Sequence, residues 1–256
     1  MAASLAATPP GRPWFVHLAE GTDGRAAGEL AALAACGGLG RATRLVHGVG
    51  LTPSDVRSAR DAGAGLVWCP SSNTNLLGAV AEPGPFAAVR RAALGTDARL
   101  TGARDILDEL AHAAGSGRAV PETLLDLVTA AGAALVGRPR AGRLTRGAPA
   151  DVVVVCDDGR PPAEQLVGAR RADLRLVVAR GRPVVADADL AYLFDATGNP
   201  KRACTLDGRP KVVLEAAVAP VAAVGIAEPG LTWPGWTGPR TDAPGPDAGD
   251  AARSAQ

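Results

Sequence analysis

Short apolar runs, each ending in or next to a residue that binds metals or moves protons, recur along the first hundred positions of the chain. The four runs are Phe15–Glu20, Leu45–His47, Leu66–Cys69 and Ala92–Asp97. They follow one another at intervals of roughly 20 to 30 residues, which is the size of one strand-helix unit. The pattern therefore predicts a parallel sheet with its chemistry at the carboxyl ends of the strands, which is the catalytic edge of βα barrels.

The segments between and after these runs carry helix signals. Capping residues, proline positions and apolar spacing predict helices over 22–37, 52–63, 103–114 and 121–136. Thr52 followed by Pro53 is typical of a helix start. In contrast, Pro70-Ser71-Ser72-Asn73 is rich in turn formers and predicts a loop with groups for hydrogen-bonding a ligand, so Ser72 and Asn73 are candidate substrate-binding residues.

The character of the chain changes after Pro139. Residues 150–155 and 174–185 are β-rich and punctuated by glycine, and Arg180-Gly181-Arg182 is typical of a hairpin turn. The last thirty residues, rich in Pro, Gly, Asp and Ala, have little to bury. The predicted division is a flexible lead-in over 1–13, a strand-helix domain over 14–137, a β-rich domain over 138–226 and a disordered tail over 227–256.

Composition excludes several classes of protein. The chain has 256 residues, 47% of them hydrophobic, which is enough for one large core or two smaller ones. A net charge of +1 gives no support to binding of nucleic acid or of an anionic membrane. No apolar stretch approaches the length of a membrane span, and the N-terminus lacks a secretory pattern, so we expect a cytoplasmic protein. The four cysteines form no CxxC pair, which argues against a zinc knuckle or a disulfide framework.

The four motifs, taken in order, resemble the amidohydrolase superfamily, and most closely its cytosine-deaminase and chlorohydrolase-like metal-dependent hydrolases. They are His17-Leu18-Ala19-Glu20, Leu45-Val46-His47-Gly48, Cys69-Pro70-Ser71-Ser72-Asn73 and Leu94-Gly95-Thr96-Asp97, and residues 142–151 are similar to the β domain of that branch. The resemblance covers about residues 14 to 190. It implies an α/β fold, the C-terminal half of a (β/α)8 TIM barrel followed by a small β-rich, sandwich-like domain.

The resemblance also implies roles for individual residues. His17 and Asp97 would bind a divalent metal ion, zinc first, with iron or manganese as alternatives. Asp97 would also receive a proton from the bound water, Glu20 would relay protons, and His47 would orient the water or polarise the substrate. Such an ion lowers the pKa of bound water from about 15.7 to near 7, and nearby carboxylates can carry its protons to a leaving nitrogen.

The sequence departs from the family pattern at one important point. Family members have a His-x-His pair at the end of the first strand, whereas the three histidines here are His17, His47 and His112. We therefore expect four strand-helix units and two metal ligands to be missing, and the isolated chain to be truncated and inactive. It would self-associate or pair with the missing N-terminal half. A lone histidine after a strand is more often structural, and for His112 we expect that role.

The leading interpretation is a hydrolase of non-peptide carbon-nitrogen bonds in a small molecule, such as an amidine deaminase or a cyclic amidase. An alternative is a non-catalytic remnant or binding subunit that pairs with another half-barrel. A third is an unrelated doubly wound α/β protein, because strand-helix repeats also fit that fold. A dinucleotide fingerprint is excluded, since Gly48-Val49-Gly50 is followed by Pro53 where the third glycine is required.

Overall fold

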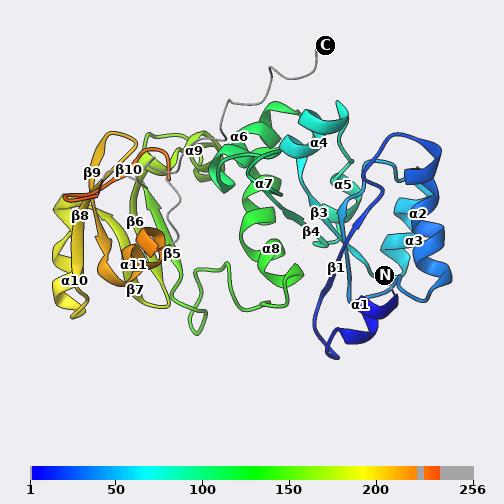
Figure 1. The fold of residues 1–256 in the computed structure, drawn as a ribbon, viewed down its shortest axis with the longest axis horizontal. Helices are drawn as coiled ribbons and strands as arrows, with labels where there is room; N and C mark the ends of the chain where they lie inside the picture. Colours follow the sequence, from blue (N-terminus) through cyan, green and yellow to red (C-terminus); the bar gives the residue numbers. More distant parts are fainter. Residues whose placement is uncertain (1, 224–227, 237–256) are drawn as a thin grey trace, which may run out of the picture. The chain divides into compact units, whose positions relative to one another are not determined.

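The computed structural model of the protein describes residues 2–223 and 228–236 (Figure 1). The chain forms two compact units. The first contains the residues up to Asp151 together with Val155–Asp173, and the second contains Val152–Val154 and the chain from Leu174 onward. The boundary that we predicted at residue 138 is therefore misplaced, because residues 138–151 belong to the first unit.

The first unit is built on a four-stranded parallel sheet. Its strands are β1 (Trp14–Leu18), β2 (Thr43–His47), β3 (Gly65–Trp68) and β4 (Ala92–Leu94), in the order β1-β2-β3-β4. All four apolar runs are confirmed as strands. Doubly wound folds reverse their strand order at a switch point, and this sequential order has no reversal. The doubly wound alternative is therefore wrong for the described sheet.

Local signals account for most of the helices in this unit. The predicted helices at 22–37, 52–63 and 103–114 are observed as α2 (Gly24–Ala35), α3 (Pro53–Asp61) and α6 (Ile106–Gly115). The Asp23 side chain caps α2, and Thr52 forms a reciprocal capping box at the start of α3. In Figure 1, α2 and α3 flank the sheet on one side, and α7 (Pro121–Val128) and α8 (Ala130–Leu135) lie on the other.

Three local predictions are wrong in this unit. The helix predicted over 121–136 is broken into α7 and α8 at Thr129, where φ is −120° and ψ is −107°. Gly142 passes so close to this break that a Cβ there would lie 2.4 Å from the Thr129 carbonyl carbon. Part of the lead-in forms helix α1 (Ala2–Ala7), and Ser4 accepts a hydrogen bond from the Trp14 indole. Residues 70–73 begin helix α4 (Pro70–Leu77) instead of a loop.

An arginine in the sheet interior ties β2 to the helical layer. Arg44 is only 7% exposed, and its Nε donates to the carbonyl of Leu135, the last residue of α8, at 2.6 Å. Its Nη1 also donates to the carbonyls of Arg41 and Thr43. A cation at a helix C-terminus is stabilised by the unpaired carbonyls there. The same contact joins the sheet of the first unit to α8.

The first unit also contains the short helices α5 (Gly84–Ala87) and α9 (Pro162–Gly168). No helix in the described ranges is both long enough and apolar enough to cross a membrane.

The second unit is a six-stranded sheet in the order β10-β8-β9-β7-β6-β5, and the pairings from β10 to β6 are antiparallel. Its strands are β5 (Val152–Val155), β6 (Leu174–Ala179), β7 (Arg182–Asp187), β8 (Lys201–Leu206), β9 (Arg209–Leu214) and β10 (Leu231–Thr232). The predicted turn at Arg180-Gly181 is confirmed, because both residues have positive φ, as a two-residue type I′ hairpin requires. Helices α10 (Tyr192–Ala196) and α11 (Glu215–Ala223) accompany this sheet. The described residues of the second unit form this one sheet, whereas a sandwich needs two.

The predicted disordered tail is wrong for residues 228–236. Strand β10 pairs with β8, and Trp233 is only 6% exposed against Cys204 and Val218. The Trp233 ring stacks on Trp236 with centroids 3.9 Å apart and planes 7° apart. Trp233 and Trp236 thus provide apolar surface for burial, which the otherwise small and polar residues of the segment did not indicate. The rest of the predicted tail, residues 237–256, lies outside the described residues.

Replacing Trp233 with alanine tests this docking. We expect Trp233→Ala to destabilise the second unit by about 3 kcal/mol, because a large buried aromatic side chain is removed. Tyr192→Ala, at a side chain that is 60% exposed, is the matched control and should change stability little. Denaturant unfolding followed by circular dichroism measures both. Equal stability of the two variants would show that Trp233 does not dock.

Candidate functional site

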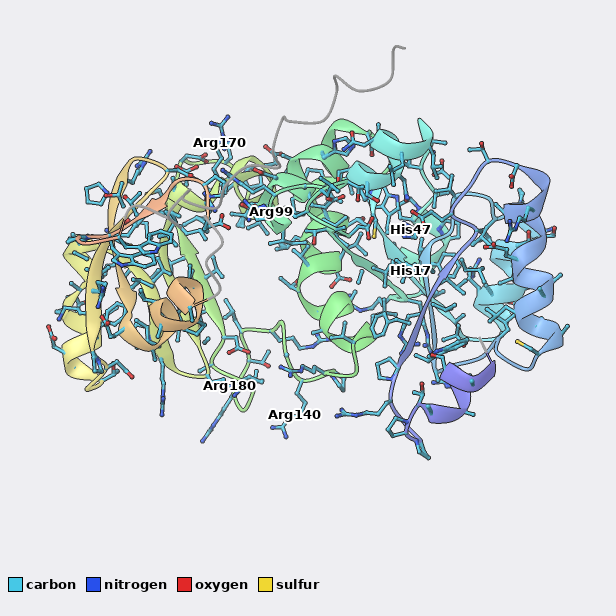
Figure 2. All side chains as sticks on the ribbon, in the orientation of Figure 1. His17, His47, Arg99, Arg140, Arg170 and Arg180 are labelled. Atoms are coloured by element: carbon cyan, nitrogen blue, oxygen red, sulfur yellow. The ribbon has the colours of Figure 1, made fainter. Side chains whose placement is uncertain are left out.

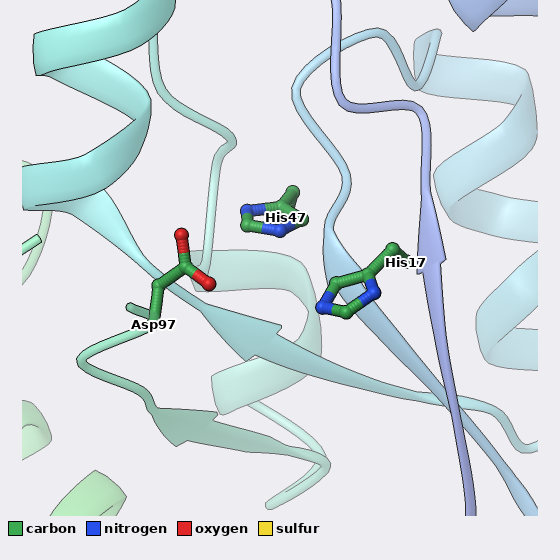
Figure 3. A group of neighbouring side chains, drawn as sticks. All are labelled: His17, His47 and Asp97. Atoms are coloured by element: carbon green, nitrogen blue, oxygen red, sulfur yellow. The ribbon is translucent and has the colours of Figure 1, made fainter. Parts of the chain in front are cut away.

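The predicted catalytic and metal-binding residues come together at the carboxyl ends of three strands. His17 is the second-last residue of β1, with Glu20 two residues beyond the strand, and His47 is the last residue of β2. Asp97 follows β4 after two residues. Figure 3 shows the side chains of His17, His47 and Asp97 turned toward one another, and Figure 2 places the two histidines in the first unit. The structure therefore gathers residues that are up to eighty positions apart in the sequence.

Three residues at these strand ends adopt a left-handed backbone conformation. The φ angles are 54° at Ala19, 75° at His47 and 55° at Asp97. This conformation costs a residue with a Cβ about 1–2 kcal/mol, and such strain gathers at functional sites. The Ala19 turn is held by a helix, because the Ala19 N–H donates to the Glu29 carboxylate of α2 at 2.6 Å. Gly50, whose N–H donates to the Ala19 carbonyl, closes the same corner.

The donor atoms are of the types that bind metal ions, and they lie close to one another. One ligand atom from each of His17, His47 and Asp97 can be chosen so that all lie within 4.8 Å of one another. Tetrahedral zinc, with bonds of about 2.0–2.1 Å, holds neighbouring ligand atoms roughly 3.4 Å apart. The group is therefore compact enough for donors within it to share one ion. The two imidazole rings are already stacked, with centroids 5.3 Å apart.

His47 is the buried member of the group. Its side chain is 1% exposed, its Nδ1 lies 2.9 Å from the Asn73 side-chain nitrogen, and its Nε2 lies 3.5 Å from the Glu20 carboxylate. Burial lowers the pKa of His47 below 6.5, because desolvation disfavours the imidazolium, and the charges of Glu20 and Asp97 offset only part of this effect. The ring is therefore held neutral between an amide and a carboxylate.

Asp97 is exposed and ionised. Partial burial opposes its ionisation, but polar neighbours, first the Ser72 hydroxyl and then the Ala98 backbone N–H and the His47 ring, outweigh burial. They hold the pKa of Asp97 below its usual value. A carboxylate that is ionised and open to solvent is suited to binding a cation and to accepting a proton.

Ser72 and Asn73, the predicted substrate-binding residues, are both fully buried. They lie in the first turn of α4, and Asn73 contacts His47 instead of facing open space. A side chain with no exposed surface cannot touch a substrate in this conformation. The predicted substrate-binding role does not fit this conformation, in which Asn73 contacts His47 and Ser72 lies near Asp97.

Two supporting carboxylates were missed by the sequence reasoning. Glu109 of α6 has no exposed surface, and its carboxylate accepts hydrogen bonds from the N–H, at 2.9 Å, and the hydroxyl of Ser71. The signal was present, because Glu109 falls among Leu107, Leu110 and Ala113 on the buried face of an amphipathic helix. Glu29 of α2, which holds the Ala19 turn, is part-buried and carried no comparable signal.

Cys69 plays no part in the donor group. It is 1% exposed, and burial, aided by the negative charges of Asp97 and Glu109, raises the pKa of its thiol to about 12. The thiolate is the form that binds metals, so the protonated thiol acts as a small buried apolar group. His112 lies away from the group, with its Nε2 3.3 Å from the Thr74 hydroxyl.

The lowered pKa of His47 predicts how stability depends on pH. Between the folded-state pKa and 6.5, the unfolded chain binds more protons than the folded chain, so the free energy of unfolding falls as pH drops through this window. We expect His47→Asn to flatten the loss of stability between about pH 7 and pH 5. Denaturant titrations across this range, with His112→Asn as the control, measure the slopes. An unchanged slope in His47→Asn would contradict the buried neutral state of His47.

Comparison with known proteins connects this geometry to a family. The model of the amidohydrolase family matches residues 15–184. A 5-methylthioadenosine/S-adenosylhomocysteine deaminase of Halobacterium salinarum is 39% identical over 124 residues, which are 43% of this chain and 28% of that protein. The 8-oxoguanine deaminase of Pseudomonas aeruginosa is 31% identical over 178 residues, 62% of this chain and 40% of that protein. The chain thus spans less than half the length of these curated relatives.

Solved structures show the same fold. An adenosine deaminase from Xanthomonas campestris with bound zinc has a TM-score of 0.60 and 24% identity, over 73% of this chain and 49% of that chain. An atrazine chlorohydrolase from Arthrobacter aurescens TC1, complexed with zinc, has a TM-score of 0.60 and 21% identity, over 73% and 48%. These likenesses indicate a TIM-barrel-type α/β fold. Because the family model covers most of the chain and all four strand-end motifs, the protein belongs to the amidohydrolase family.

Proposed function

We propose that this chain supplies the carboxyl-terminal part of the active site of a metal-dependent deaminase. The observation that carries the proposal is the meeting of His17, His47, Glu20 and Asp97 at adjacent strand ends in a member of the amidohydrolase family. The reaction would be hydrolysis of a non-peptide carbon-nitrogen bond, with water adding to the carbon of an amidine and ammonia leaving.

His17 and Asp97 would hold one divalent ion in this site. Both side chains are exposed and carry donors that zinc accepts, and the named structural relatives contain zinc. When bound, the ion supplies a water molecule of lowered pKa. Two ligands are fewer than the three protein ligands typical of catalytic zinc, so we expect this chain alone to bind the ion weakly.

The remaining groups would move protons and orient the reactants. Asp97, kept ionised by its neighbours, accepts a proton from the attacking water. Glu20 carries a proton to the nitrogen that leaves as ammonia, so the two hydrogens of the water end on the product hydroxyl or carbonyl tautomer and on ammonia. His47, 3.5 Å from the Glu20 carboxylate, donates a hydrogen bond from Nε2 to the attacking oxygen.

The names of the relatives narrow the proposed substrate to an aminopurine ring. The curated relatives are named as deaminases of 5-methylthioadenosine, S-adenosylhomocysteine and 8-oxoguanine, and each of these compounds carries an amino group on a purine carbon next to ring nitrogen. This is the amidine unit that the proposed water would attack.

The proposal includes a partner half for the sheet. Edge strands β1 and β4 each pair on one side in the described sheet, and Phe15 on β1 is 46% exposed. Parallel sheets are normally buried, and unpaired edges favour association. We infer that four further strand-helix units, with a His-x-His pair, complete the site, either in one polypeptide or as a second chain. Without them the chain would be inactive and would self-associate.

Replacing Glu20 separates proton transfer from metal binding. In an assembly that joins this chain to the amino-terminal half of a relative, Glu20→Gln should retain zinc but lower turnover of an aminopurine by ~10²-fold. His17→Ala should lose zinc and turnover together. Zinc per chain and ammonia release measure the two effects, with the exposed Glu122→Gln as a matched control.

The same assembly decides between an enzyme and a non-catalytic remnant. Zinc bound in full amount without release of ammonia from any of a panel of aminopurines and cyclic amides would contradict the proposed activity. Loss of zinc in Glu20→Gln to the extent seen in His17→Ala would instead assign Glu20 as a metal ligand.

A further inference from the structure

The hydrogen bond between His47 and Asn73 determines which ring nitrogen of His47 carries the proton. Asn73 has no exposed surface and His47 is 1% exposed, so water does not compete for the contact. The Asn73 side-chain nitrogen lies 2.9 Å from His47 Nδ1. In this orientation of the amide the nitrogen donates, so Nδ1 accepts, and the ring proton of the neutral imidazole then resides on Nε2.

The contact at the other ring nitrogen, Nε2, agrees with this assignment. Nε2 lies 3.5 Å from the Glu20 carboxylate, and a carboxylate only accepts. Rotating the Asn73 amide by half a turn would place its oxygen on Nδ1, leaving a bare Nε2 lone pair aimed at a negative charge. Both neighbours therefore favour the tautomer with hydrogen on Nε2. A nitrogen that carries hydrogen has no lone pair for a metal ion.

We propose that Asn73 is a positioning residue that keeps His47 a hydrogen-bond donor and prevents it from acting as a metal ligand. Histidine ligands in metal sites donate their second ring N–H to a carboxylate, a carbonyl or water, which leaves the other nitrogen free for the metal. Asn73 imposes the opposite arrangement. This inference rests on the proposed function in so far as it assigns the metal to His17 and Asp97.

Glu109 fixes Asn73 in place from outside the site. Pro70 at the first position of α4 has no N–H, and Cys69 provides no side-chain cap. The buried carboxylate of Glu109 instead accepts from the N–H and hydroxyl of Ser71, two positions before Asn73. A carboxylate at a helix N-terminus is a charge-assisted cap that interacts favourably with the helix dipole. A continuous path of hydrogen bonds and one helical turn thus runs from α6 to His47.

Nuclear magnetic resonance of the ring nitrogens tests the proposal in the full chain without catalysis. The protein has three histidines, so the variants His17→Asn and His112→Asn assign the His47 signals. At about pH 8, where a histidine with pKa near or below 6.5 is neutral, we expect Nε2 to be protonated and Nδ1 to show the shift of a hydrogen-bond acceptor. A wild-type His47 with its proton on Nδ1 would overturn the proposal, whatever the variants do.

Asn73→Asp should reverse the arrangement. A carboxylate at this position accepts from Nδ1–H and frees Nε2, so the chain gains a third ligand and should bind zinc at least ~10-fold more tightly, the lower end of the effect of such supporting partners. Asn75→Asp adds the same charge on an exposed position of the same helix, and its affinity should stay within about 2-fold of wild type, because it does not touch the ring. Competition with a chromophoric chelator measures both.

A second set of variants keeps the test decisive if Asn73→Asp does not fold. Asn73→Ala should move the Nδ1 signal toward that of a nitrogen without a donor, and Glu109→Gln should move it part of the way. Glu122→Gln, an exposed change of the same kind, should leave the Nδ1 signal unmoved.

A lower melting temperature of Glu109→Gln with an unmoved His47 signal would reduce Glu109 to a structural role and contradict the proposed path from Glu109 to His47. Equal zinc affinity of folded Asn73→Asp and Asn75→Asp would contradict the role of Asn73, while loss of activity alone would concern only the proposed function.

Discussion

The parallel register of β1 and β2 is the constraint on which the site depends. Leu18 pairs with His47, so in two regular strands the side chain of His47 would share a face with Leu18 and lie opposite His17. Yet the two imidazole rings are stacked. The positive φ of His47 resolves this conflict, because it turns the last residue of β2 away from its regular direction. The strain at this residue is therefore tied to the geometry of the donor group.

Periodicity and caps were sufficient to predict most of the first unit. Apolar runs of strand length recur with helical segments between them, and Asp23 and Thr52 mark helix starts by bonds that reach only three residues. Local chemistry of this kind is visible in a sequence. The start of α4 was missed because its cap comes from Glu109, 38 residues away from Ser71. A helix whose first turn is capped by another helix carries no local capping signal.

The same distinction explains the errors in the second unit and in the site. Trp233 is held by Cys204 and Val218, so the order of its segment depends on tertiary packing that composition does not report. Asn73 was read as a ligand-binding residue because its amide can bind many partners. The structure shows that its partner is His47. The meeting of His17, His47 and Asp97, in contrast, follows from the rule that parallel strand ends share one edge of a sheet.

The site is built in two parts with different surroundings. His47, Ser71, Asn73 and Glu109 are buried, and their hydrogen bonds connect β2, α4 and α6. His17, Glu20 and Asp97 are exposed, and all three lie close to the His47 ring. The buried part is held rigidly by its own contacts, so it can orient an imidazole before any ligand arrives. The exposed part has donors without a covering layer. An ion, a substrate and any further ligands must therefore reach the site from the side of His17 and Asp97, which is the side where the proposed partner half would close over it.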